Sequence, residues 1–338
     1  MTPRESALAA LELAPPHGLV PHMELEFQLS AEAFGPQYRA LRRDDLVGIS
    51  APRRQDLLKR NAEMWVMVAE RFKYNIITGL HWLDIEDQCC SFEYIRHLAG
   101  DTYMLSAFCD GTFAIPSGKE MMAHVIWLTE HEDKALAEAD RRVGQSIQQA
   151  ETLIEAGAEV VLMCSDYCFN DGPFLSPRMF AKFVTPFLAK QVAGIHAAGG
   201  YAVKHTDGNI TPILDQLVGT GIDALHSLDP LGGMDIREVK RLIGDRICFI
   251  GNVNMPFIQR GTPEQIEESC LYCLEHGGVE QGGYMYSTSN CIFEGVPLDN
   301  YELMLELRER YGYVGESPWA DGSCRNRTVS RHSHSHSG

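Results

Sequence analysis

Basic residues are scarce in this chain. Its 338 residues include 29 Lys and Arg against 46 Asp and Glu, which gives a formal net charge of -17 at pH 7. Nucleic acids and anionic membranes are bound through basic surfaces, so neither is an expected partner. A polyanionic substrate is also disfavoured unless arginines gather in the pocket.

Long apolar runs are missing as well. No stretch reaches the roughly 20 apolar residues of a membrane span, and the first residues lack a basic segment followed by an apolar run. The ten cysteines include Cys270-Leu-Tyr-Cys273, but no second pair stands at zinc spacing, which favours buried thiols over a metal site there. We therefore expect a cytoplasmic protein with reduced cysteines.

What the chain does contain is a regular alternation of strand and helix patterns. Short β-rich apolar runs predict eight strands, near residues 20–27, 74–78, 103–108, 159–164, 201–205, 222–227, 246–251 and 283–287. Helical patterns follow the runs, with extra helical stretches at 31–43 and 53–72 and at 117–156, where a break is expected near His131-Glu132.

Eight alternating units favour an α/β fold of the (β/α)8 TIM-barrel type. No Gly-x-Gly-x-x-Gly fingerprint follows the first strand, which argues against a doubly wound sheet, although an open α/β sheet stays the alternative. We expect one barrel over residues 1–316, with helical insertions near 31–72 and 117–156. Residues 317–338 end in alternating His and Ser and predict an irregular, disordered tail.

In a barrel, functional side chains gather where the strands end. His205 and Asp207 have the period-two spacing that places both on one face of a strand, and they can act as two metal ligands or as a base with an orienting carboxylate. Further ligands would come from other strands, and the candidates are Glu24, Glu26, Asp166 and Cys291. Each of these residues also has a structural interpretation, as a turn, cap or hydrogen-bonded core residue.

A family resemblance adds to this interpretation. The segments HTDGNITPILDQLVGTGIDALHSLDP, GGMDIREVKRLIGDRICFIGNVN, GTPEQIEE and GGYMYSTSNCIFEGVP resemble the uroporphyrinogen decarboxylase-like superfamily, over about residues 158 to 312. The resemblance implies a barrel enzyme, either a uroporphyrinogen decarboxylase or a zinc-dependent corrinoid methyltransferase.

Departures from the family patterns separate these two activities. The decarboxylases carry an Arg-Gln-Ala-Gly-Arg segment near the first strand, where this chain has His22-Met-Glu-Leu-Glu-Phe-Gln28. Glutamates there would repel a polycarboxylate. The coenzyme M type of methyltransferase binds zinc through a His-x-Cys motif and a later Cys. Here Asp207 replaces the first Cys, and Cys291 stands one place beyond the second.

The resemblance therefore implies a methyltransferase that moves a methyl group from a small methylated compound, such as a methyl ether, to a corrinoid protein. In this hypothesis His205, Asp207 and Cys291 hold zinc, and His205, Asp207 and Asp166 are catalytic. The residues expected to hold the substrate are Glu26, Tyr167, Asn252 and Asn290.

Two other functions stay open. One is a cofactor-free decarboxylase of a small acid or tetrapyrrole, with Asp166 or His205 as the proton donor. The other is a non-catalytic barrel that binds a small ligand. The sequence leaves the assembly state open as well, with a homodimer as one arrangement.

Overall fold

The computed structural model describes residues 1–316, so the predicted tail at 317–338 lies outside the described residues. Seven parallel strands form one curled sheet in the order β1-β2-β3-β6-β7-β8-β9. Their bounds are β1 Ile76–Ile77, β2 Met104–Phe108, β3 Val160–Met163, β6 Tyr201–Thr206, β7 Ala224–Ser227, β8 Cys248–Val253 and β9 Tyr284–Thr288. These seven strands confirm the predicted positions, and the fold is an α/β barrel of the TIM type.

The predicted first strand is the exception. Residues 20–28 occupy its place between β9 and β1 but form only isolated parallel bridges, at His22 with Tyr286 and at Phe27 with Ile292. Pro21 has no N–H to donate, and the His22 N–H goes to the side chain of Asn75 at 2.8 Å. The main-chain ladder is therefore interrupted, and this segment, which we call the seam, closes the ring partly through side chains.

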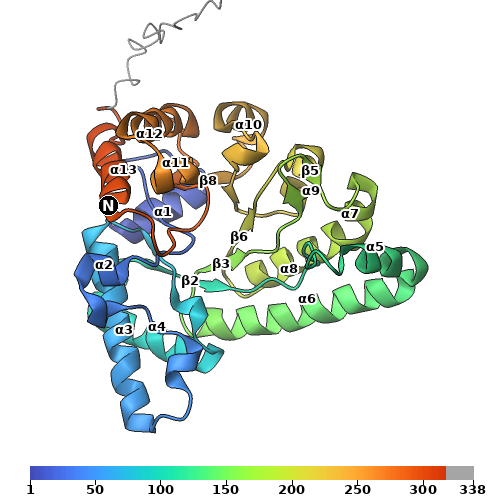
Figure 1. Ribbon diagram of the computed structural model, residues 1–338, viewed down its shortest axis with the longest axis horizontal. Coiled ribbons are helices and arrows are strands. Elements are labelled where there is room, and N and C mark those ends of the chain that lie inside the picture. Colours follow the sequence, from blue (N-terminus) through green and yellow to red (C-terminus); the bar gives the residue numbers. More distant parts are fainter. Residues whose placement is uncertain (317–338) are drawn as a thin grey trace, which may run out of the picture.

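Helices surround the strands (Figure 1). The helices up to β6 are α1 Pro3–Leu11, α2 Ser30–Phe34, α3 Ala51–Arg71, α4 Ile85–Ala99, α5 Met121–Glu130, α6 Glu132–Glu155, α7 Pro177–Phe183 and α8 Thr185–Ala197. After β6 come α9 Leu214–Gly219, α10 Ile236–Ile243, α11 Met255–Arg260, α12 Pro263–Gly277 and α13 Leu298–Tyr311. A short hairpin of β4 (Cys168–Phe169) and β5 (Gly172–Pro173) lies in the loop after β3.

The sequence signals explain several helix boundaries. α5 and α6 meet at His131, where a break is expected, and Thr262 forms the expected capping box with Gln265 at the start of α12. The predicted helix at 31–43 is wrong: α2 ends at Phe34, because Gly35 has φ +108° and Pro36 follows, and short 3-10 turns continue the chain.

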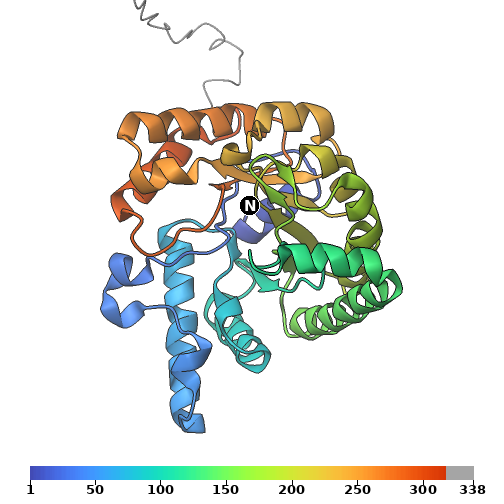
Figure 2. The same cartoon turned by 45° about the vertical axis from the view of Figure 1, so that its right-hand side comes forward.

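The barrel interior is apolar at its amino-terminal end and centre. Helix α1 closes that end: its Ala7, Ala10 and Leu11 pack in the same cluster as the inward side chains of the strands, and Figure 2 shows it at the centre of the ring. The inward side chains are Met23, Leu25, Ile76, Met104, Val160, Leu162, Val203, Ala224, Cys248, Ile250 and Met285. Polar groups therefore remain for the opposite end, where the strands stop.

Candidate active site

Three side chains with metal-ligand chemistry meet at the carboxyl ends of β3 and β6. One ligand atom each of Asp166, His205 and Asp207 lies within 4.8 Å of the others. The Nε2 of His205 is 3.9 Å from an Oδ1 of Asp166 and 3.9 Å from an Oδ1 of Asp207. The cluster opens outward, because the Asp166 side chain is 48% exposed and that of His205 only 7%.

The alternation of β6 explains why His205 faces inward. Val203, two residues before it, belongs to the barrel interior, whereas Ala202 packs in the outer layer of helices. The strand register pairs His205 with His226 of β7, and their Nδ1 atoms are 2.8 Å apart. Burial, together with the charge of Lys204, lowers the pKa of His205 to about 3, so its imidazole is neutral at physiological pH.

Asp207 follows β6 and is held at both oxygens. The Ser227 hydroxyl donates to its Oδ1 at 2.6 Å, and the Asn290 amide donates to its Oδ2 at 2.5 Å. Burial raises the pKa of Asp207 to about 7, with the Asp166 charge adding to the shift and the two hydrogen bonds opposing it. The Asn290 Oδ1 accepts from the Cys291 N–H at 2.7 Å, which orients the amide toward this carboxyl.

A buried ion pair behind the sheet positions Asp166. Lys204 points away from the barrel interior, and its ammonium donates to Asp110 at 2.8 Å and to the Ser165 carbonyl at 2.8 Å. The Ser165 N–H in turn donates to Asp110 at 2.9 Å. Burial opposes ionisation of Asp110, but the charge of Lys204 and its hydrogen bonds lower the pKa of this carboxyl. The pair thus holds the turn from which Asp166 projects.

A third carboxylate, that of Glu26, lies near Cys291. Glu26 accepts from Gln28 at 2.9 Å and contacts the Nε2 of His81 at 3.0 Å. Burial disfavours its ionisation, yet the hydrogen bonds and charge of His81 outweigh this and lower the pKa of Glu26. Glu26, Asp207 and Cys164 act electrostatically on the Cys291 thiol, whose pKa burial raises well above its usual range. Cys291 therefore carries a neutral thiol near the site.

The structure does not gather every residue that the sequence suggests. Tyr167 is buried behind the sheet, where its hydroxyl contacts Thr112 at 2.6 Å and Lys204 lies over its ring. Asn252 donates to the Leu228 carbonyl at 2.7 Å and accepts from the buried thiol of Cys273. Both side chains thus lie in the layer between strands and helices, away from the Asp166 cluster.

Glu24 also turns away from Glu26. Its carboxyl is completely buried and accepts hydrogen bonds from Ser287 and Thr288 of β9. The acidic face that period-two spacing predicts for the seam is therefore reduced to Glu26. His226 shows the opposite case: sequence spacing does not connect it with His205, and the register of β6 and β7 brings the two side chains together.

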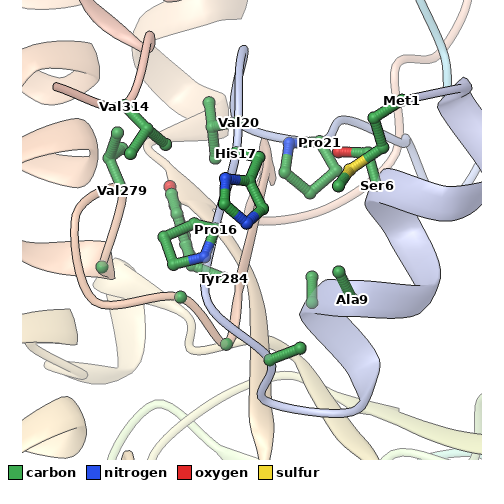
Figure 3. A pocket seen from close by; sticks show the side chains of 15 residues that line it. Met1, Ser6, Ala9, Pro16, His17, Val20, Pro21, Val279, Tyr284 and Val314 are labelled. Carbon is green, nitrogen blue, oxygen red and sulfur yellow. The ribbon is translucent and has the colours of Figure 1, made fainter. Parts of the chain in front are cut away.

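The opposite end of the barrel holds a small cavity. Its wall includes Ala9, Pro16, Val20 and Tyr284, as Figure 3 shows, and its volume is about 20 Å³. That volume admits about one water molecule. This cavity is therefore too small for a substrate.

Comparison with known proteins identifies the family. The family model for uroporphyrinogen decarboxylase (URO-D) matches residues 91–311, more than half of the chain. The chain belongs to this family.

Among the residues that the structure describes, no helix is long and apolar enough to cross a membrane.

Relatives of this URO-D family member carry two kinds of name. A methylcobamide:CoM methyltransferase MtaA from Methanosarcina barkeri is 28% identical over 196 residues, 58% of this chain and 53% of that protein. A uroporphyrinogen decarboxylase from Chlorobium luteolum is 27% identical over 158 residues, 46% of this chain and 42% of that protein. The chain thus spans about half the length of the curated relatives it matches.

A solved structure shows the shared fold. A methyltransferase from Methanosarcina mazei superposes with a TM-score of 0.70 at 19% identity, covering 92% of this chain and 99% of that one. This likeness confirms the barrel architecture.

Proposed function

We propose that this URO-D family member is a methyltransferase that takes a methyl group from a small methylated compound and passes it to a corrinoid protein. The observation that carries the proposal is the buried imidazole nitrogen of His205, 3.9 Å from two carboxylate oxygens at the open end of the barrel. Resemblance to a methylcobamide methyltransferase supports it.

The three side chains suit a divalent metal ion, zinc in particular. Zinc binds imidazole and carboxylate, and catalytic zinc sites use three protein ligands with one position left open. Tetrahedral bonds of about 2.1 Å place ligand atoms about 3.4 Å apart, so the 3.9 Å separations would shorten by about 0.5 Å. Asp166, which is half exposed, has room for that movement. This set replaces Cys291 of the sequence-based hypothesis with Asp166, because Cys291 is outside the cluster.

Each residue of the site has a defined task in this proposal. A bound zinc ion supplies Lewis acidity, which stabilises the negative charge on the atom that loses its methyl group. The contact with His226 holds the His205 side chain in place. Hydrogen bonds from Ser227 and Asn290 hold the Asp207 carboxyl. Glu26, which with Asp207 acts electrostatically on Cys291, would orient the substrate or carry a proton for the leaving group, with His81 as its partner.

The test uses a chain ending at residue 316, which keeps every described residue and removes the His-rich tail. We expect bound zinc, and methylcobamide formation when a methylated substrate and a corrinoid protein are supplied. His205→Ala should abolish metal retention and lower the rate at least about 100-fold. His196→Ala is the matched control, because His196 pairs with Asp223 at 2.8 Å on the outer surface. Unchanged zinc content and rate in His205→Ala would refute the proposal.

A second function is favoured by one observation. The pKa of Asp207 is raised to about 7, so a share of its carboxyl groups holds a proton at neutral pH. In a decarboxylase of a small acid, that proton could quench the carbanion left after CO2 departs. Carboxylates at Asp166 and Glu26 would still repel a polycarboxylate, so uroporphyrinogen is not the expected substrate. Coproporphyrinogen formation from uroporphyrinogen in an anaerobic assay would overturn this last expectation.

A further inference from the structure

A chain of buried polar side chains runs from the seam to the candidate site. It passes from Glu24 through Ser287 of β9 and His226 of β7 to His205 of β6. All four residues are buried, with exposed fractions of 5% or less for the whole residue. Because these groups are buried, each hydrogen must go to a nearby protein acceptor, and along the chain the direction of one hydrogen bond limits the next.

Glu24 determines the direction of the hydrogen bond at its end of this chain of side chains. Its Oε2 accepts the main-chain N–H of Thr288 at 3.2 Å, and a main-chain N–H can only donate. The Thr288 hydroxyl also lies 2.6 Å from Oε2 and 2.7 Å from the Asn290 carbonyl, which can only accept. If the carboxyl is protonated on Oε2, that hydrogen goes to the Thr288 hydroxyl, whose own hydrogen goes to the carbonyl. In either charge state Oε2 is an acceptor toward Ser287, whose hydroxyl donates to it at 3.2 Å.

The Ser287 hydroxyl has a single hydrogen, which this bond uses. Toward His226 its oxygen can then only accept, and the two atoms Oγ and Nε2 are 3.5 Å apart, the longest link of the chain. The hydrogen in that link therefore belongs to Nε2 of His226. A neutral imidazole has one N–H, so Nδ1 of His226 is left with a lone pair.

The last link lies between the two Nδ1 atoms, 2.8 Å apart. A contact of this length between ring nitrogens holds one hydrogen, and since His226 offers a lone pair, the hydrogen is on Nδ1 of His205. Nε2 of His205 then has no hydrogen and faces the oxygens of Asp166 and Asp207. A lone pair surrounded by two carboxylates attracts a cation or a strong hydrogen-bond donor.

We propose that Glu24, Ser287 and His226 are positioning residues that fix the tautomer of His205, with its hydrogen on Nδ1 and its Nε2 lone pair presented to the site. The use of that lone pair as a ligand for a divalent cation rests on the proposed function, whereas the tautomer does not. Ser287 is the residue whose removal breaks the chain, because its hydroxyl is the link between Glu24 and His226.

The tautomer can be read directly by 15N NMR of the full chain, labelled at histidine and freed of metal by a chelator. A ring nitrogen with a hydrogen and one with a lone pair have well-separated chemical shifts, and the His205 signals are identified by their loss in His205→Gln. We expect Nδ1 of His205 to carry the hydrogen in the wild-type protein. A hydrogen mainly on Nε2 would overturn the proposal without any variant.

Variants then test the row of hydrogen-bonded side chains from Glu24 to His205. Ser287→Ala should give His205 signals that report a mixture of tautomers, whereas Ser106→Ala, a buried serine bonded to the Ile77 carbonyl, should leave them unchanged. Glu24→Gln should preserve the wild-type tautomer, because an amide oxygen can accept the same hydrogen bonds. Wild-type signals in Ser287→Ala would refute the role of Ser287. Because the samples hold no metal, loss of zinc binding or of methyl transfer in other assays would not alter this result.

Discussion

Replacing Glu24 by Gln should remove a large part of the pH dependence of folding stability. Burial raises the pKa of this carboxyl from 4.5 to about 8, and its hydrogen bonds to Thr288 and Ser287 only partly oppose the shift. The folded protein therefore keeps a proton that the unfolded chain releases above pH 4.5. The stabilising contribution is complete below that pH and is lost as the pH rises toward 8.

The magnitude follows from linkage. Each pH unit within this window costs about 1.36 kcal/mol, so raising the pH from about 5 to about 7.5 should lower the free energy of unfolding by roughly 3 kcal/mol through Glu24 alone. The side-chain amide of the Glu24→Gln variant has no proton to lose, and its NH2 group at the place of Oε1 adds a pH-independent cost of about 1–3 kcal/mol.

Urea unfolding at both pH values measures the effect as a difference between variant and wild type, which cancels the other titrating groups. Glu306→Gln, on the exposed face of α13, is the matched control and should follow the wild type. Parallel pH dependence in Glu24→Gln and the wild type would show that Glu24 ionises normally in the folded protein, and the argument from burial would fail.

Three further substitutions test other parts of the fold. Lys204→Met should destabilise the protein by about 3–5 kcal/mol, because Asp110 is left buried without its counter-charge, as denaturant unfolding would show. Gly79→Ala should cost about 2–4 kcal/mol by the same assay, because Gly79 has φ +77° and an added Cβ would lie 2.1 Å from a buried indole ring. Thr262→Ala should cost about 1 kcal/mol through loss of the α12 cap, measured as a lower Tm.

Each of these has a control of the same chemical kind. Lys190→Met breaks an exposed ion pair and should cost at most about 1 kcal/mol. Gly118→Ala meets no atom within 4 Å, and Thr152→Ala lies on the exposed face of α6, so both should stay within about 0.5 kcal/mol of the wild type. If a control loses as much stability as its partner, the assigned cause is wrong.

The sequence was sufficient for the barrel because seven strands carry their own signal. Each is a short apolar run followed by a helix with recognisable ends, and these local patterns agree with the global fold. The seam lacks such agreement. Residues 20–28 have the alternation of a strand, but Pro21 and the side chain of Asn75 take the place of ladder hydrogen bonds, and alternation alone does not reveal this.

The candidate site also has residues whose positions the sequence predicts and others whose positions it does not. Period-two spacing within β6 correctly places His205 toward the interior. Beyond the strand ends that period no longer applies, so Tyr167, adjacent to Asp166, turns behind the sheet, and Asn252 packs against Cys273. Pairing between strands is also invisible in a single sequence, which is why the contact of His205 with His226 required the register of β6 and β7.

The seam contacts parts of the chain that are far away in the sequence and are therefore synthesised much later. His22 contacts the Tyr286 carbonyl across 264 residues, and Glu24 finds its partners on the same strand. Before β9 has been made, His22 and Glu24 have no place to be buried, and β1 and β8 remain open edges. Ring closure is therefore a late event that the translation of the last strand permits, and a chain that stops short of β9 exposes both edges to pairing with other chains.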